Sequence, residues 1–423
     1  MPDETTISVW DTTSAEPDLG KGLNGDTACD VAIIGGGYTG LSTALHAAEK
    51  GMNCHVLEAQ RIGHGGSGRN VGLVNAGLWM PPQDVQAILG EAKSVPLIKA
   101  LGDMPEYVFS LIEKHQIQCE PHRSGTIHAA HSPSGFRNLQ RRAEGWKRLG
   151  VHVDLLDASD VAEKTGSNAF FGGLLDRRAG TIDPMGYTRG LGRAALSAGA
   201  RISVGTKAQN LSHDGTHWTV STNQGIVTAK YVVLATNAYA DDLWPGLRQS
   251  YTSIPFFQLS TQPLGAPANH ILKGNQGLWD TAPIMFSLRR DNQGRLIIGS
   301  MGAIHGDTTG LSQRWAAKTL HRLFPDLGPV EFESAWHGQI AMTSDHIFRI
   351  HRPAENLFAP VGYNGRGIIT GTLFGQALSD LMTGAPEDTL PVPISDIQPA
   401  RFRTVKTNLF QTAFTMNQFW KSL

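Results

Sequence analysis

The sequence has little cysteine, no long apolar run and no excess of charge of either sign. Its 423 residues include three cysteines, Cys29, Cys54 and Cys119, and no C-x-x-C pair, which argues against a disulfide framework and a structural zinc site. No apolar stretch reaches the ~18 residues that a membrane-spanning helix needs. The 36 Lys and Arg against 37 Asp and Glu leave a net charge of −1, which excludes the broad basic surface of a nucleic-acid-binding protein.

The N-terminal stretch 1–20 is polar and acidic and lacks the apolar centre of a secretory signal peptide. We therefore expect a soluble protein of the reducing cytoplasm, without a bound metal. Hydrophobic residues make up 40% of the chain and charged residues 17%, which is enough for a large core. At roughly 150 residues per domain, the length predicts two to three domains.

Glycine is the residue present in excess. The chain has 48 glycines, about 11% where ~7% is usual. No G-X-Y period is present, so a collagen-like structure is excluded. The backbone must therefore turn tightly or lie close to a ligand at several places.

The first glycine cluster lies in a strand–turn–helix–strand pattern. Apolar residues 30–34 predict a strand, a G-x-G-x-x-G motif begins at Gly35, and 41–50 predicts a helix. A second strand, 53–57, ends at Glu58, 23 positions after Gly35. In such a βαβ unit the glycines let the backbone approach a pyrophosphate at a helix N-terminus, and the acidic residue binds ribose hydroxyls. A glycine-rich loop without a ligand is the alternative.

A second glycine run, residues 61–75, follows this unit directly. An extended run of small residues after the ribose-binding strand suits a long, flat cofactor such as FAD better than NAD. Ser67, Arg69 and Asn70 supply hydrogen-bond donors there. A flexible surface loop is the alternative for this segment.

Three segments together resemble one family. Residues 62–77, 175–187 and 362–367 are similar to the D-amino-acid oxidase/sarcosine oxidase superfamily of FAD-dependent oxidoreductases. Within it they resemble the branch that includes γ-glutamylputrescine oxidases and bacterial L-pipecolate oxidases, the latter most. The resemblance extends from residue 10 to about 395.

The resemblance implies roles for matching positions. Residues 235–239 would lie beside the adenine of FAD, and 362–367 would begin a helix whose N-terminus faces the flavin pyrimidine, where it stabilises negative charge. The expected cofactor-binding residues are Gly35, Gly37, Tyr38, Thr39, Gly40, Glu58, Ala59, Arg61, Gly66, Ser67, Arg69, Asn70, Val71, Gly72, Leu73, Thr236, Asn237, Tyr239, Gly362, Tyr363, Asn364, Gly365, Arg366 and Gly367. Monomeric sarcosine oxidases attach their flavin to a cysteine in the C-terminal half. This chain has none after Cys119, so we expect non-covalent FAD, with His64 as the alternative attachment point.

Amine oxidation by hydride transfer needs a C–H bond over flavin N5 and a neutral amine nitrogen. A substrate carboxylate would need an arginine. The expected catalytic residues are Arg69, Asn70 and His346. The expected substrate-binding residues are Tyr251, Trp279, Arg289, Trp336 and Tyr363. The alternatives are that each aromatic residue belongs to the ordinary core and that Arg289 is solvent-exposed.

The predicted fold is α/β, with a Rossmann-like FAD-binding domain and an inserted antiparallel β-sheet domain that binds substrate. The FAD-binding domain comprises 1–95, 165–250 and 345–400, and the substrate domain comprises 96–164 and 251–344. A helical tail, 401–423, would dock on the body of the protein, with a partner subunit or a membrane surface as alternatives.

The predicted function is FAD-dependent oxidation of a cyclic or secondary amino acid, most concretely L-pipecolate to its piperideine carboxylate, with oxygen or an electron carrier as acceptor. A γ-glutamylputrescine-type oxidase or an N-methyl- or D-amino-acid oxidase is the alternative on the same fold. From other classes, an NAD-dependent dehydrogenase, a non-catalytic flavin-binding partner and an RNA-modifying enzyme remain open, the last disfavoured by the near-zero charge.

Overall fold

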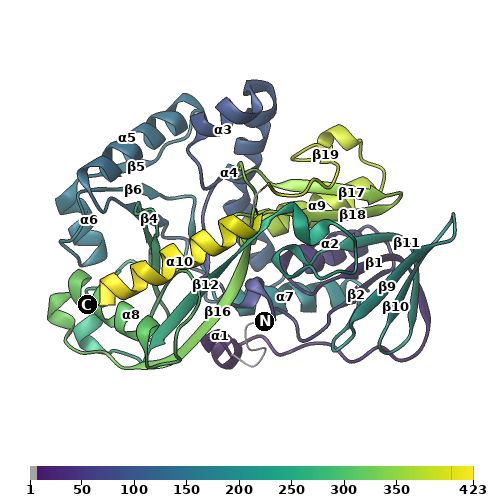
Figure 1. Cartoon of the computed structure of the whole chain (residues 1–423), viewed down its shortest axis with the longest axis horizontal. Coiled ribbons are helices and arrows are strands. Elements are labelled where there is room, and N and C mark those ends of the chain that lie inside the picture. The colour runs from purple at the N-terminus through teal and green to yellow at the C-terminus, as the bar shows by residue number, and fades with distance from the viewer. Residues whose placement is uncertain (1–6, 402, 423) are drawn as a thin grey trace.

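The computed structural model describes residues 7–401 and 403–422 and is built around two large β-sheets (Figure 1). Both sheets combine segments that are far apart in the sequence. The predicted α/β fold is confirmed, because helices cover a largely parallel sheet while a second sheet is mainly antiparallel.

The first sheet has nine strands in the order β19-β17-β18-β11-β1-β2-β8, with β10 and β9 added beside β11. Central strand β1 runs parallel to both of its neighbours and is buried on both faces at its C-terminal end, as an apolar run predicts. The strands are β1 (Thr27–Ile34), β2 (Cys54–Leu57), β8 (Arg201–Ser203), β9 (Ala208–His213), β10 (Trp218–Thr222), β11 (Ile226–Leu234), β17 (Arg349–Ala354), β18 (Leu357–Val361) and β19 (Ile394–Ser395).

One face of this sheet is covered by four helices whose apolar side chains share a core with Val31, Ile33 and Val56. They are α2 (Tyr38–Glu49), α4 (Glu91–Lys114), α7 (Pro184–Ser197) and α9 (Gly367–Met382). Helices α2 and α9 pack directly on each other: Ser42 Oγ donates to the Thr372 carbonyl at 2.8 Å. The N-termini of both helices follow glycine turns, so their packing brings those turns together.

The second sheet has eight strands in the order β16-β12-β15-β14-β13-β4-β6-β5. Apolar residues such as Phe286 and Leu288 face helix α8 (Leu311–Leu323), whereas Arg289 and Trp336 face the glycine-rich segments. The strands are β4 (Thr126–Ala129), β5 (Asp154–Leu156), β6 (Gly173–Asp176), β12 (Thr252–Thr261), β13 (Gly277–Asp280), β14 (Phe286–Arg290), β15 (Leu296–Met301) and β16 (Phe332–Met342).

Two predicted domain boundaries differ from the sheet organisation. Strand β6 lies in the predicted FAD-binding segment 165–250 but pairs with β4 and β5 of the second sheet. Helix α4 lies mostly in the predicted substrate segment 96–164 but packs in the core of the first sheet. The remaining elements are α1 (Val9–Thr13), β3 (Leu73–Val74), α3 (Pro82–Leu89), α5 (Pro133–Arg148), α6 (Ala158–Thr165), β7 (Gly180–Thr181) and α10 (Arg403–Ser422).

The predicted helical tail corresponds to α10, which crosses the front of the second sheet (Figure 1). It packs against α8 and β12. Residues 1–6 of the predicted FAD-binding domain, and 402 and 423 of the tail, lie outside the described part of the chain.

Candidate active site

The first glycine turn joins β1 to α2 at the carboxyl edge of the parallel sheet. Gly35 has φ +114°, and a side chain there would also meet the backbone carbonyl of Ala235 at 3.0 Å. A Cβ on Gly40 would overlap the Gly35 carbonyl oxygen, so only glycine lets α2 start this close to the strand. The first turn of α2 leaves backbone N–H groups without helical partners, which makes it an anion-binding end.

Glu58 lies at the end of β2, beside this turn. Its carboxylate accepts hydrogen bonds from the N–H groups of Gly36 (2.7 Å) and Gln60 (2.8 Å). Burial raises the pKa of Glu58 above its usual value, and these two hydrogen bonds offset only part of that rise. Two other predicted cofactor residues nearby point elsewhere: Ala59 is exposed, and Arg61 forms a bidentate ion pair with Asp11 at 3.0 Å.

The second glycine segment is fastened to the start of α2. Ser67 Oγ accepts from the Tyr38 N–H at 3.0 Å, and the Tyr38 hydroxyl donates to the Ser67 carbonyl at 2.7 Å. Asn70 Nδ2 donates to the Tyr38 hydroxyl and to the carbonyls of Gly66 and Ser67, while its Oδ1 accepts from Gly72 N–H. The polar atoms of Asn70 are therefore engaged in holding this loop, which makes it a positioning residue.

Arg69 is also engaged by the backbone. Its guanidinium is buried and donates to the carbonyls of His64 (2.6 Å) and His337 (3.0 Å), and burial lowers its pKa. The carbonyl of Arg69 accepts from Trp336 Nε1 at 2.8 Å. Arg69 thus ties the second glycine segment to strand β16. Both it and Asn70 were predicted to be catalytic, and the structure uses both side chains to shape the loop.

The third glycine turn connects β18 to α9. The Tyr363 hydroxyl and Thr39 Oγ1 are 2.6 Å apart, which joins this turn to the first turn of α2. Asn237 Oδ1 accepts from the Gly362 N–H at 3.0 Å, which joins it to the segment after β11. Asn364 accepts from the Thr343 N–H at 2.9 Å. Three of the predicted cofactor-binding segments are therefore in direct contact at one edge of the sheet.

Beside the third turn lies a buried cluster of cations and aromatic rings. Arg366, the N-cap of α9, lies with its guanidinium 4.8 Å from the centroid of the Trp279 ring. Trp279 stacks on His128 with ring centroids 3.4 Å apart and an angle of 11°. Arg142 lies 5.9 Å from the same Trp279 ring and donates to the carbonyl of Trp79.

Charge in this cluster is not neutralised by direct pairing. Among the ion pairs of the described residues, none involves Arg366 or Arg142. Burial and the nearby Arg142 lower the pKa of Arg366 to about 9. Burial lowers the pKa of Arg142 to about 10 and holds that of His128 well below its usual range. A negatively charged group bound here would gain two buried cationic neighbours.

His346 stands at the edge of the same cluster. Its ring contacts Trp79 edge-on at 5.0 Å, and its backbone N–H donates to the Thr343 carbonyl at 3.3 Å. Burial lowers the pKa of His346, so the neutral imidazole dominates at pH 7. Its Nδ1 has no hydrogen-bond partner within the described residues. The predicted residues Trp279, His346, Tyr363 and Arg366 are thus brought into one region.

Three other predicted substrate-binding residues are elsewhere. Arg289 and Trp336 pack around Trp10, at 5.1 Å and 6.2 Å from its ring. Tyr251 lies in the core beside β11 and β18. Arg289 is fully buried rather than exposed, and its charge faces Glu120, Asp183 and Asp291, which favours a structural role.

Trp79, His128 and Arg142 were not among the predicted site residues. These residues lie between the glycine motifs, on segments that carry no recognisable binding motif. The pairing of β13 with β4 and the packing of α5 bring His128 and Arg142 to Trp279. Trp10 was also missed: its Nε1 donates to the Asn70 carbonyl at 3.0 Å, under the second glycine segment.

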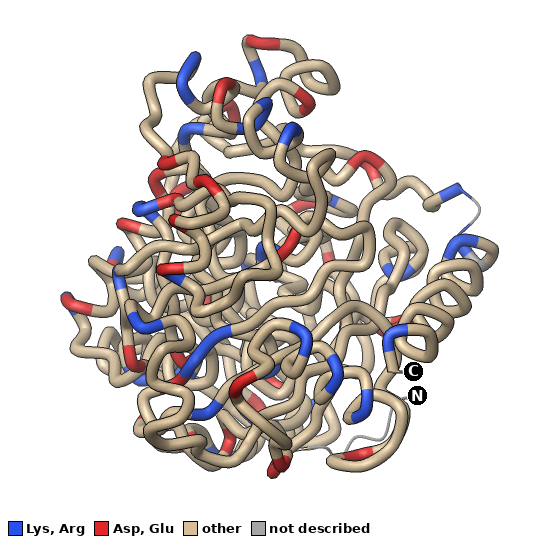
Figure 2. The backbone as a smooth tube through the Cα atoms, turned by 90° about the vertical axis from the view of Figure 1, so that its left-hand side faces the viewer, with Lys and Arg blue, Asp and Glu red and all other residues tan. Residues whose placement is uncertain are grey.

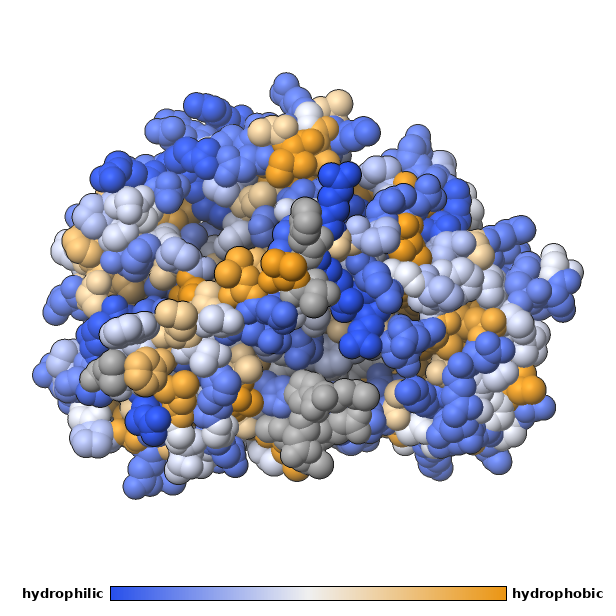
Figure 3. All heavy atoms as spheres, in the orientation of Figure 1, coloured by the Kyte–Doolittle hydropathy of each residue, from blue (hydrophilic) through white to orange (hydrophobic). Residues whose placement is uncertain are grey.

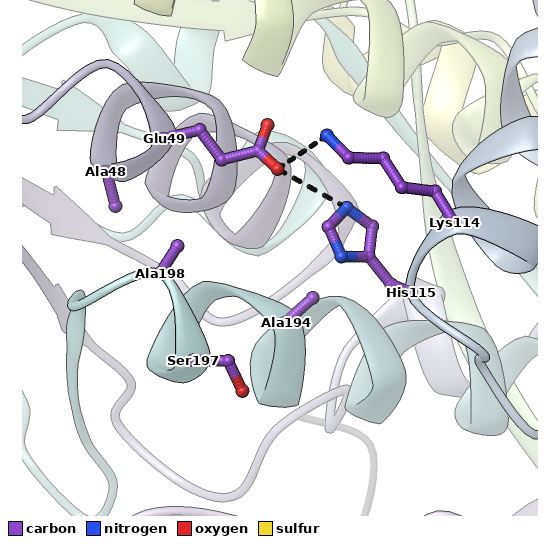
Figure 4. A pocket seen from close by; sticks show the side chains of 7 residues that line it. All are labelled: Ala48, Glu49, Lys114, His115, Ala194, Ser197 and Ala198. Carbon is purple, nitrogen blue, oxygen red and sulfur yellow. Dashed lines mark hydrogen bonds and ion pairs between the residues drawn. The ribbon is translucent and has the colours of Figure 1, made fainter.

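A surface depression of about 690 Å³ lies at the other end of α2 (Figure 4). Glu49 pairs there with Lys114 at 2.6 Å and with His115 at 3.5 Å. At 1.5 Å per residue this end of α2 is about 17 Å from its N-terminus. The depression is therefore separate from the glycine turns.

The three glycine turns, the two helix N-termini and Glu58 together fit a flavin dinucleotide, because Gly35 and Gly40 let α2 begin close to the end of β1 and a helix N-terminus placed there binds phosphate. Comparison with known families agrees. The model of the DAO family, described as FAD dependent oxidoreductase, matches residues 30–381. The chain belongs to this family: it is an FAD-dependent oxidoreductase, as predicted, and the NAD-dependent alternative is not supported.

Individual proteins that are similar to this chain include two oxidoreductases and a glycine oxidase. The chain is 32% identical over 375 residues to γ-glutamylputrescine oxidoreductase of Escherichia coli strain K12, covering 86% of each protein. It is 29% identical over 365 residues to the probable oxidoreductase OrdL of Rhizobium meliloti, covering 86% of this chain and 85% of the relative. Glycine oxidase from Geobacillus kaustophilus shares the fold, with a TM-score of 0.70, 22% identity and coverage of 85% of this chain and 95% of that structure.

Proposed function

We propose that the protein oxidises a C–N bond of a small amine that also carries a carboxylate, with a γ-glutamylated diamine as the first candidate substrate. The observation that carries this proposal is the buried guanidinium of Arg366, which lies on Trp279 without a carboxylate partner among the described residues. The similarity to γ-glutamylputrescine oxidoreductase supports this alternative better than the L-pipecolate prediction.

Bound FAD supplies the two-electron acceptor for the hydride of the substrate carbon. Arg366 would bind the carboxylate, and Trp279 would pack against the methylene groups of the substrate. Their burial limits the competition of water for these contacts. His346 is held neutral by burial, so its imidazole can accept the proton that an ammonium group must lose before oxidation.

The test is the response of Arg366→Met to substrates with and without a carboxylate. We expect the γ-glutamylputrescine concentration that gives half the maximal rate of flavin bleaching to rise about tenfold or more, because a charge-assisted hydrogen bond is lost. Reaction with putrescine, which has no carboxylate, should change little. Anaerobic bleaching of the flavin absorbance measures both. Equal losses for the two substrates would contradict carboxylate binding by Arg366.

A second candidate is oxidation of a cyclic amino acid such as L-pipecolate. It is favoured by the position of Arg366 at the first turn of α9, because the family resemblance places that turn beside the flavin, close to the reacting carbon. L-Pipecolate, L-proline and sarcosine should therefore be included in the same bleaching panel. Faster bleaching by any of these than by γ-glutamylputrescine would select this second candidate.

A further inference from the structure

Helix α10 exposes a stripe of large apolar side chains to solvent. Val405, Leu409, Met416, Phe419 and Trp420 are each between 51% and 66% exposed. These five belong to one 20-residue helix, although only twelve large apolar side chains are exposed in the whole described chain. At 100° per residue they fall within about 100° of arc. Figure 3 shows orange and tan atoms along the path of this helix.

The opposite side of α10 is fixed to the protein. Phe414 and Gln418 are buried, and Gln418 donates to the Ala303 carbonyl at 2.9 Å and accepts from Ser312 Oγ at 2.9 Å. His305 Nε2 lies 3.2 Å from Thr415 Oγ1. The apolar stripe is therefore held outward by its own docking contacts.

Positive charge surrounds this stripe. Neighbouring helix α8 presents Arg314, Lys318 and Arg322 at helical spacing, all exposed, and neither α8 nor α10 contains an acidic residue. Arg401, Arg403, Lys406 and Lys421 add to the same region. The carboxylate that faces Lys421 and Arg322 from the sheet, Asp280, is buried. Figure 2 shows basic positions near both ends of α10 and no acidic ones on it.

This basic region belongs to a chain whose net charge is −1, so the positive charge is segregated. A second copy of the chain would bring a second basic face against the first, which like-charge repulsion opposes. An anionic lipid surface complements both features, because phospholipid headgroups attract the basic residues while Trp, Phe and Leu enter the boundary of the acyl region. The helices of the described chain include none that is long and apolar enough to cross a membrane.

We propose that α8 and α10 form a peripheral binding surface for an anionic lipid bilayer, with α10 lying in the plane of the interface. The match to the family model ends at residue 381, so α10, which carries the apolar stripe, lies outside the matched part of the chain, whereas α8 lies inside it.

The experiment is sedimentation of the FAD-loaded protein with vesicles. We expect binding to vesicles of phosphatidylcholine with 30% phosphatidylglycerol, about tenfold weaker binding to pure phosphatidylcholine, and loss of binding in 0.5 M NaCl. Leu409→Glu and Lys318→Glu should each weaken binding several-fold. The matched controls are Ile226→Glu and Lys230→Glu, exposed on strand β11 at the other end of the molecule (Figure 1), and they should bind like the parent protein.

Flavin absorbance and oxidation with a soluble dye acceptor should be unchanged in all four variants, which shows that each one is folded. Failure of the parent protein to bind anionic vesicles would overturn the proposal. So would a dimer, seen by light scattering, that Leu409→Glu converts to monomers, since a second copy would then cover the stripe. Binding to both vesicle types with no effect of salt would also contradict it.

Discussion

Single atoms decide whether the first glycine turn can hold its cofactor. A methyl group on Gly40 would collide with the Gly35 carbonyl oxygen, which belongs to backbone and cannot rotate away. At Gly192, in the middle of α7, the nearest atom to an added methyl group would be the end of the Leu19 side chain, at 3.1 Å, which can move aside. We therefore expect Gly40→Ala to be purified without FAD and to lose about 1–3 kcal/mol of the free energy of unfolding. Gly192→Ala should keep both.

The measurement is flavin absorbance per protein after desalting, together with urea unfolding of each variant. Stoichiometric FAD in Gly40→Ala would show that α2 can move away from the strand. It would also show that the close approach is not needed for binding.

For single residues, the sequence predicts where a side chain lies better than it predicts what that side chain does. The motifs correctly place Gly35 and Gly40 in the turn between β1 and α2 and Glu58 at the end of β2, because these positions depend on local backbone geometry; their contact with the cofactor stays a prediction. Arg69 and Asn70 carry the donors that a catalytic site needs, yet both are engaged by backbone groups of their own loop. A sequence does not show whether a side chain's hydrogen bonds are satisfied internally.

Helix α7 begins at a buried acidic N-cap. Its N-cap, Asp183, accepts hydrogen bonds from the N–H groups of Met185 and Gly186 at 2.9 and 3.1 Å. Burial raises the pKa of Asp183 to about 6, from a model-peptide value of 3.8. A raised pKa favours the protonated folded state, so this contribution to stability is present below about pH 4 and is lost as the pH rises through 6.

Asp183→Asn keeps the cap oxygen and removes the titration. We expect the free energy of unfolding of the parent protein to fall relative to this variant by roughly 2 kcal/mol between pH 4 and 7. Urea unfolding at pH 4, 5, 6 and 7 measures the difference. The control is Asp157→Asn, an exposed N-cap of α6 whose pKa is lowered by the Asp160 N–H; its pH dependence should have the opposite sign. A constant difference for Asp183→Asn would contradict the prediction.

Element boundaries follow well from the sequence where the pattern is local. The helix predicted at 41–50 and the strand predicted at 53–57 correspond to α2 and β2 with small shifts. Strand β6 lies in the predicted FAD-binding segment but pairs with β4 and β5, which lie earlier in the sequence. Such long-range pairing is set by side chains on both strands, so it does not follow from the pattern of one segment. The cluster around Trp279 depends on the same long-range pairing, so its members could not be grouped from the sequence.

At the scale of the whole molecule, the short helix α1 near the N-terminus packs against the second glycine segment. Trp10 is buried between Arg289 and Trp336 and donates to the Asn70 carbonyl. Trp10→Ala should cost about 3–5 kcal/mol of the free energy of unfolding and should speed the release of FAD. Dilution with fluorescence detection of released flavin measures the latter.

Trp420→Ala is the matched control, because that tryptophan is 65% exposed and should leave both stability and FAD release unchanged. Release of FAD at the parent rate from Trp10→Ala would show that the second glycine loop holds its shape without the N-terminal segment.

The hydrogen bond between Thr39 and Tyr363 spans 324 residues, and this separation has a consequence for biosynthesis. The ribosome makes the first glycine turn early, but its partner on α9 emerges only after most of the chain has been synthesised. Strand β11 likewise gains its neighbour β18 only after that later segment has been synthesised. The flavin site is therefore completed late, since contacts between distant segments form only once both exist. A nascent chain that stalls before α9 lacks one wall of the site, and free FAD then has little to stabilise.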